Sequence, residues 1–195
     1  MNDQIEFDAI AWINDYFRGS VQLDFDHLRP ILCFSLIWNL FETHACRRHA
    51  TAESIRHSVD HADESGRLRR ERYERYLGFF RSRYLTPDRT TDFFFDHLLL
   101  TERRAQEVVR RALHGESQDL NNHVYALLLI AHRVRNNLFH GNKKVESLPR
   151  QIDLFHTVNA LLATYLEDIE NLPARRQTSA SSLPRARGGN SAAET

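Results

Sequence analysis

Apolar residues recur every three to four positions along most of the chain, the spacing of helices that bury one face. The predicted helices cover residues 5–17, 28–41, 52–64, 67–84, 101–114, 117–140 and 149–172. Residues 90–100 form a further short and very apolar segment. We therefore predict an all-α fold, a bundle of helices joined by short loops.

Residues that favour helix ends support these boundaries. Asp24 or Asp26 can cap the long second helix, with Pro30 tolerated in its first turn. Thr51 is placed to cap the polar helix 52–64, and Gly66 to end it. The chain has only 7 Gly and 5 Pro, which argues against a turn-rich sandwich or barrel.

The chain divides into one helical domain, residues 1–172, and a tail. Residues 173–195 are rich in Ser, Ala, Arg, Pro and Gly and lack apolar anchors, so we expect them to be disordered. No run of about 18 apolar residues is present, and the acidic N-terminus lacks a signal-peptide pattern. Two cysteines cannot form a disulfide framework. We expect a cytoplasmic protein without membrane contact. Of the two cysteines, we expect Cys33 to lie in the core.

The net charge of zero conceals a locally basic middle. Residues 46–115 contain fifteen Arg and eleven acidic residues, and the helix 67–84 mixes Arg with Tyr and Phe. Cations interleaved with aromatic residues suit an RNA backbone and its bases, so Arg69, Arg72 and Arg83 are candidate RNA contacts. The alternative is a solvated face whose Arg residues pair with Glu71 and Glu74.

One segment at the end of the most apolar helix carries a recognisable motif. It reads Arg135-Asn136-Asn137-Leu138-Phe139-His140-Gly141-Asn142. The same Arg-to-His spacing occurs at Arg56 and His61, but there it lies on a polar, surface-like helix. An Arg and a polar residue, followed by a His at the end of an apolar helix, resemble the HEPN family of helical domains in bacterial defence and toxin systems. The ending Leu-Phe-His-Gly resembles the Apea-like branch.

This resemblance implies a metal-independent endoribonuclease in a toxin or anti-phage system, with RNA as substrate and no cofactor or metal. It also implies a homodimer in which the motifs of two protomers meet, and we expect the apolar helix 117–140 to supply the interface. An antitoxin or other regulatory protein is a further candidate partner. One branch of the family is controlled by modification of a Tyr two residues after the His. Position 142 is Asn, so this mode of control is not expected here.

The residue types suit RNA cleavage, with Arg135, Asn136 and His140 as the candidate catalytic residues. A His that titrates near neutrality can move protons at the 2′-oxygen and the leaving 5′-oxygen. A guanidinium can stabilise charge on the phosphate, and Asn136 can orient the phosphate or the imidazole. On a regular helix Arg135 and His140 point about 140° apart, so either the helix breaks before His140 or the site is composite.

Other polar residues are weaker candidates. Asn39 and Glu42 lie three apart on an apolar helix and are candidate auxiliary residues, while Trp38 and Phe41 beside them are expected in the core. Lys143 and Lys144 follow the motif directly and can meet substrate phosphates. His57, Asp60 and His61 have helical spacing that can bind a metal, but no third distant ligand is evident, so we expect a solvated face.

Two functions that differ from catalysis remain open at this point. The motif can be a helix C-terminus in which Gly141 adopts a left-handed conformation and the Asn side chains cap carbonyls. The protein is then a non-catalytic helical interaction module. The second alternative is an RNA-binding accessory subunit that uses the basic helix 67–84.

Overall fold

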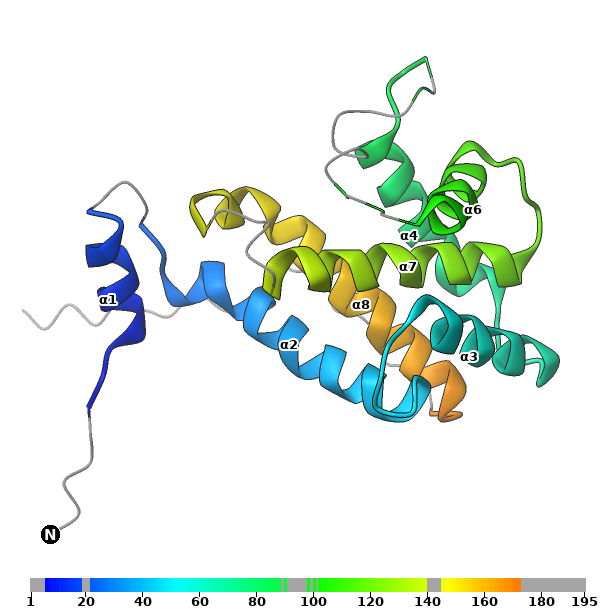
Figure 1. Ribbon diagram of the computed structural model, residues 1–195, viewed down its shortest axis with the longest axis horizontal. Helices are drawn as coiled ribbons and strands as arrows, with labels where there is room; N and C mark the ends of the chain where they lie inside the picture. Colours follow the sequence, from blue (N-terminus) through cyan, green and yellow to red (C-terminus); the bar gives the residue numbers. More distant parts are fainter. Residues whose placement is uncertain are drawn as a thin grey trace, which may run out of the picture.

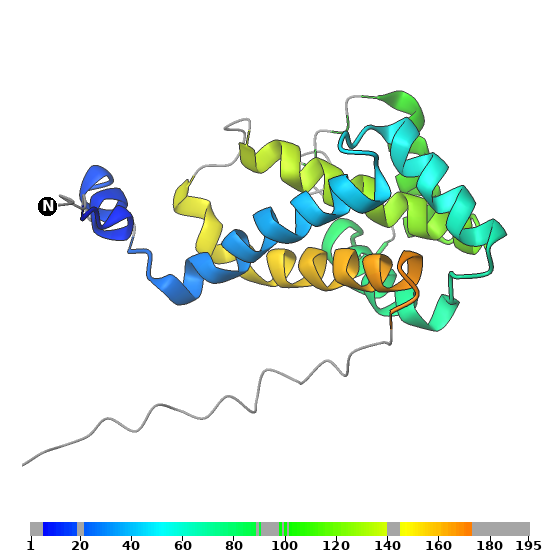
Figure 2. The same cartoon turned by 90° about the horizontal axis from the view of Figure 1, so that it is seen from below.

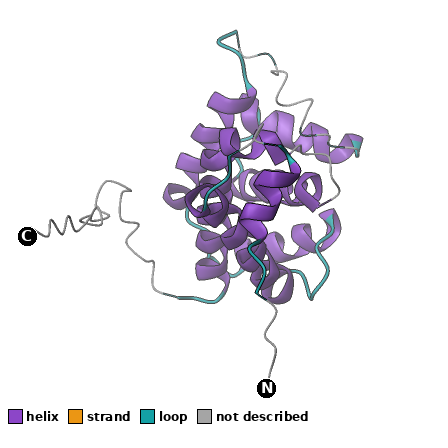
Figure 3. Ribbon diagram, turned by 90° about the vertical axis from the view of Figure 1, so that its left-hand side faces the viewer, coloured by secondary structure: helices purple, strands orange, loops and turns teal. Residues whose placement is uncertain are grey.

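The computed structural model describes residues 6–18, 22–88, 90, 98, 100, 102–139 and 145–172. Within these ranges the regular structure is helical and no strand occurs, so the predicted all-α class is confirmed (Figure 3). In chain order the elements are α1 (Ala9–Tyr16), α2 (Phe25–Ala45), α3 (Ala52–Glu64), α4 (Arg70–Tyr84), α6 (Arg103–His114), α7 (Leu120–Phe139), the 3₁₀ helix η1 (Val145–Gln151) and α8 (Ile152–Ile169). The predicted tail 173–195 and most of the apolar segment 90–100 lie outside the described residues.

Helix α7 lies in the middle of the bundle and contacts α3, α4, α6 and α8 (Figure 1). Its buried apolar side chains are Val124, Ala126, Leu127, Leu128, Leu129, Ile130, Ala131 and Val134. Neighbouring helices of the same chain therefore cover α7 on several sides. This coverage explains why the helix is so apolar without any need for a dimer interface along it.

Helices α2 and α8 run side by side and form the largest helix pair of the bundle (Figure 2). Aromatic rings fill the space between them: the Phe34 and Phe155 ring centroids are 5.6 Å apart, and those of Phe41 and Tyr165 are 6.0 Å apart. Trp38 and Phe41 are buried, as predicted. Large buried rings of this kind dominate core energetics.

A buried polar cluster fixes α4 against α8. The Arg72 guanidinium forms ion pairs with Glu167 and Asp168, and the Tyr73 hydroxyl donates to Asp168 Oδ2 at 2.6 Å. Burial raises the pKa of Asp168, while the hydrogen bond from Tyr73 and the charge of Arg72 act in the opposite direction. These two partners thus offset the cost of burying the charged Asp168 carboxylate.

Capping residues set the boundaries of the helices largely as predicted. Asp24 caps α2 through a hydrogen bond from the backbone N–H of His27 to its Oδ1, at 2.8 Å. Thr51 caps α3 in a reciprocal capping box with Ser54. The chain reverses after α3 at Gly66, whose φ of 63° is in the left-handed region.

Two expectations about α2 are wrong. Pro30 is the sixth residue of the helix that starts at Phe25, so it lies in the second turn rather than the first. Cys33 is exposed and not part of the core, because it shares the outer face of α2 with Leu32 and Leu36. Periodicity places apolar residues on a helix, but it does not show which face a neighbour covers.

Helix α1 stands apart from the bundle (Figure 1) and buries none of its residues. Two hydrogen bonds tie it to the start of α2, from Asn14 Nδ2 to the Leu23 carbonyl and from the Leu23 N–H to Asn14 Oδ1. Its rings stack on one another, with the Trp12 and Tyr16 centroids 5.4 Å apart. None of the described helices is long and apolar enough to cross a membrane.

Candidate functional site

The last turns of α7 carry the first half of the sequence motif. Arg135 and Asn136 are half-buried, and the Arg135 guanidinium lies 5.4 Å from the centroid of the exposed Phe139 ring. Arg135 Nη1 donates to Asn136 Oδ1 at 3.2 Å. The pair therefore meets directly, and the ring beneath the guanidinium adds a cation–π contact.

The Arg135 contact fixes the orientation of the Asn136 amide. A guanidinium only donates, so the amide oxygen must face Arg135 and the NH₂ group must face the other way. There Asn136 Nδ2 lies 3.3 Å from His132 Nε2, one helical turn earlier on α7. Since an NH₂ group also only donates, His132 Nε2 must be an unprotonated acceptor. The proton of the neutral imidazole is therefore on Nδ1.

His132 has the surroundings that this tautomer requires. Its ring stacks on Trp38 with 5.8 Å between centroids and 18° between planes, and it hydrogen-bonds the backbone of Ala50. Burial, together with the nearby charges of Arg135 and Arg133, lowers the pKa of His132 to about 4. The imidazole is thus neutral at physiological pH.

Glu42 secures the loop that carries Ala50. Its Oε1 accepts the Ala50 N–H at 3.4 Å, and its backbone carbonyl accepts the Arg48 N–H at 2.7 Å. Arg47 and Arg48 have φ values of 51° and 71°, in the left-handed region where non-glycine residues are uncommon. The Ala50 N–H is already bonded to Glu42. The Ala50 carbonyl is therefore the backbone group left to accept a hydrogen bond from His132 Nδ1.

A directed chain of hydrogen bonds thus connects the loop between α2 and α3 to the motif. It runs from the Ala50 carbonyl through His132 and Asn136 to Arg135, and each donor and acceptor role is fixed by its neighbour. Glu42, one of the predicted auxiliary residues, is brought to this chain through Ala50. Asn39, the other, is exposed on α2.

His132 is the residue that the sequence analysis missed. It lies three and four positions before Arg135 and Asn136, and this spacing puts all three side chains on adjacent positions of one helical surface. The signal was therefore present, but His132 falls within an apolar run and resembles a simple core residue. Only the tertiary contacts to Trp38 and Ala50 distinguish it.

The second half of the motif is not described. His140, Lys143 and Lys144 lie outside the described residues, and the described part of α7 runs to Phe139. The expected angle between Arg135 and His140, and the expected contacts of the two lysines with phosphates, stay predictions.

The three candidate arginines of the basic helix have different environments. Arg69 is exposed just before α4, whereas Arg72 is committed to Glu167 and Asp168. Arg83 is half-buried and hydrogen-bonds Tyr84. Arg69 and Arg83 are fourteen residues apart, which separates their backbones by about 20 Å along the helix. We therefore retain Arg69 alone as an exposed candidate on this helix.

Two hollows lie near these elements. One, of about 120 Å³, is lined by residues that include His132, Arg133 and Asn136 together with Glu102 and Ala105 at the start of α6. Another, of about 770 Å³, lies along α3 and includes His57 and His61. Among the described residues, no three His, Cys, Asp or Glu side chains converge to hold a metal ion.

Comparisons with family models, with curated proteins and with solved structures find no match for this chain.

Proposed function

We propose that the chain is a metal-independent endoribonuclease of the HEPN type, acting in a toxin or anti-phage system. The observation that supports this most is the hydrogen-bond chain that holds Asn136 and Arg135 in one orientation, four residues before His140. Groups that are positioned before the substrate arrives are what catalysis by charge stabilisation requires.

The proposed reaction is an internal transesterification of RNA. The 2′-oxygen attacks the adjacent phosphorus, the bond from phosphorus to the 5′-oxygen breaks, and the products carry a 2′,3′-cyclic phosphate and a 5′-hydroxyl. One proton leaves the 2′-oxygen and one is delivered to the 5′-oxygen; His140 serves these transfers. Arg135 stabilises the charge that develops on the phosphate, since a guanidinium has five N–H donors and Asn136 takes only one.

We also propose that the active form is a homodimer, with the exposed apolar face of α2 as its interface. Leu32, Leu36 and Leu40 recur at four-residue intervals along this face, and Leu36 is 70% exposed. Phe139, beside Arg135, is exposed as well. A two-fold contact places the same surface on both protomers, so the Leu36 face of one protomer packs on the same face of the other.

The experiment is cleavage of mixed RNA by the purified protein in EDTA. Wild type should cleave, and Arg135→Ala and His140→Ala should each lose activity by at least about 10²-fold. His61→Ala is the matched control, because His61 stands five residues after Arg56, as His140 does after Arg135, and lies exposed on α3. Loss of activity only in the motif variants supports the proposal. Full activity of His140→Ala refutes the assignment, and absence of cleavage by wild type favours a helical binding module.

A further inference from the structure

A basic groove lies between α6 and the start of α7. It has a volume of about 550 Å³, and its lining includes Arg103, Arg104 and Arg111 from α6 and Asn122 from α7. The three arginines are exposed, and the backbone between the first and the last of them rises by about 12 Å. Val108, from the same face of α6, contributes an apolar surface between the cations.

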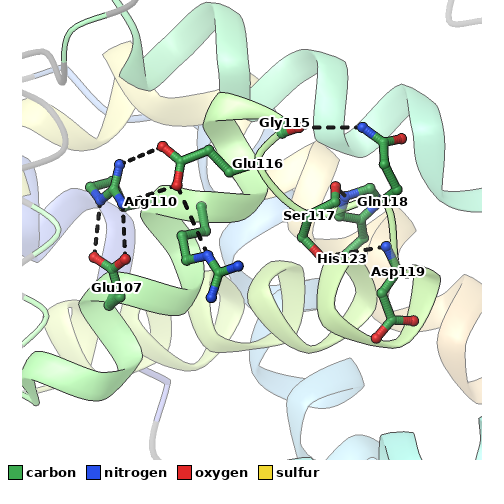
Figure 4. Close-up of polar contacts among 9 residues, drawn as sticks. Glu107, Arg110, Gly115, Glu116, Ser117, Gln118, Asp119 and His123 are labelled. Carbon is green, nitrogen blue, oxygen red and sulfur yellow. Dashed lines mark hydrogen bonds and ion pairs between the residues drawn. The ribbon is translucent and has the colours of Figure 1, made fainter.

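The acidic residue in this lining is already neutralised. Glu107 accepts two hydrogen bonds from Arg110, at 2.8 Å and 3.0 Å, and Arg110 also donates to Glu116 at 2.7 Å (Figure 4). The hydrogen bonds from Arg110 hold the pKa of Glu107 below its usual range, so the carboxylate is charged and remains paired. Arg111 Nε also lies 3.9 Å from Glu116 Oε2, so Glu107 and Glu116 together balance Arg110 and Arg111. Arg103 and Arg104 therefore give the groove its excess of positive charge.

Helix α3 adds a further cation at the margin of the groove. Arg56 Nη1 donates to the groove residue Asn122 at 3.0 Å, and its guanidinium lies 5.0 Å from the Tyr125 ring centroid. Arg104 of α6 also lies near Tyr125. Burial raises the pKa of Tyr125, and the charge of Arg104 acts in the opposite direction. Arg56 is itself paired with Asp60, with 3.0 Å between Nε and Oδ1, so it borders the groove without adding net charge, whereas Arg104 adds to that charge.

The groove leads toward the candidate site. The first turn of α6 contributes Arg103 and Arg104 to the groove, and Glu102 and Ala105 to the small hollow that contains His132 and Asn136. A chain bound along α6 would therefore reach the motif within about one helical turn. The arginines of α4 offer no such path, because Arg72 is occupied by carboxylates of α8.

We propose that this groove binds the phosphodiester backbone of single-stranded RNA and guides it to the motif. The role as a guide rests on the proposed ribonuclease function, whereas binding does not. Arginine forks suit phosphate oxygens, and contacts with the backbone alone bind RNA without sequence preference.

The probe is a labelled 2′-O-methyl oligouridine, which cannot be cleaved because it has no free 2′-hydroxyl. We compare wild type, Arg103→Gln/Arg104→Gln and the control Arg18→Gln/Arg75→Gln, which removes two exposed arginines outside the groove. Loss of two phosphate contacts should lower the salt slope by about 1.4 units, or about 25-fold in affinity at 0.1 M salt. The control should bind like wild type, and melting curves should show that all three proteins are folded.

The outcomes separate the groove from the reaction. If the groove variant loses binding while wild type fails to cleave unmodified RNA, the groove is supported and the ribonuclease is refuted. If wild type does not bind the oligonucleotide, or if the groove variant binds it unchanged, the groove proposal is overturned. Binding of poly-glutamate as tight as that of the oligonucleotide would also overturn it, because the groove would then recognise charge alone.

Discussion

The unusual state of His132 makes the fold sensitive to acid in a way that can be calculated. In the folded chain its pKa is about 4, against an ordinary value of 6.5, because the ring is buried against Trp38 and the charges of Arg135 and Arg133 lie nearby. Between these two pH values the unfolded chain binds a proton that the folded chain does not. The part of the stability that depends on neutral His132 is therefore fully present above pH 6.5 and is lost as the pH falls toward 4.

The size of the effect follows from the difference in pKa. Each unit of difference in pKa corresponds to about 1.4 kcal/mol. Protonation of His132 in the unfolded chain therefore lowers the free energy of unfolding by about 2 kcal/mol at pH 5 and by about 3 kcal/mol at pH 4. Burial raises the pKa of Asp168, so other groups also change the response to acid and the comparison must be between variants. His132→Phe keeps an aromatic ring against Trp38 and removes the titrating group.

The assay is urea unfolding of wild type and His132→Phe at several pH values from 7 to 4. His132→Phe removes the acceptor of the Asn136 hydrogen bond, so it should be less stable than wild type at pH 7. On going to pH 4, wild type should lose about 3 kcal/mol more unfolding free energy than the variant, so the difference between the two proteins shrinks or changes sign. The exposed His61 provides the control: His61→Phe should follow wild type at every pH. A constant gap between wild type and His132→Phe would refute the buried neutral imidazole. So would an NMR titration that shows His132 protonating near pH 6.5, or carrying its proton on Nε2.

The other predictions concern the core, the α2 face and the tail. Arg72→Gln should destabilise the fold by about 3 kcal/mol, because Asp168 is then buried with Tyr73 as its remaining described partner; Arg69→Gln should change the unfolding free energy by less than about 0.5 kcal/mol. Equal effects in urea unfolding would contradict this pairing. Leu36→Glu should convert a dimer to a monomer in light scattering with little change in melting temperature, since Leu36 is exposed; a wild-type monomer at tens of micromolar that still cleaves RNA would contradict the dimer. Deletion of residues 173–195 should leave the melting temperature nearly unchanged, and a fall of more than a few degrees would show that the tail packs on the fold.

The elements that the sequence predicted best are those defined by local signals. Helix α3 begins after Thr51 and ends before Gly66, as its capping residues indicated. Such signals act within a few residues and need no knowledge of the rest of the fold. The burial of Trp38 was predictable for a similar reason, since it lies on the apolar stripe of a long helix.

Properties that depend on tertiary partners could not be read from the pattern. The Arg residues of α4 resembled a basic surface, but Arg72 meets Glu167 and Asp168, which are nearly a hundred positions later. Cys33 occupies an apolar stretch, yet none of the described helices covers it and its side chain is exposed. In both cases periodicity identified a helix correctly and gave no information about its neighbours.

The structure also bears on the alternative in which the motif merely ends a helix. In that case the Asn side chains should cap carbonyls in the last turn of α7. Instead Asn136 donates to the side chain of His132, and Asn137 donates to the Leu98 carbonyl of another segment. A helix end has no need of a buried imidazole with a fixed tautomer, whose neutral form makes the fold sensitive to acid. A polar chain of this kind is understandable if the orientation of Arg135 matters, because each bond in it restricts the next and the last one restricts the guanidinium.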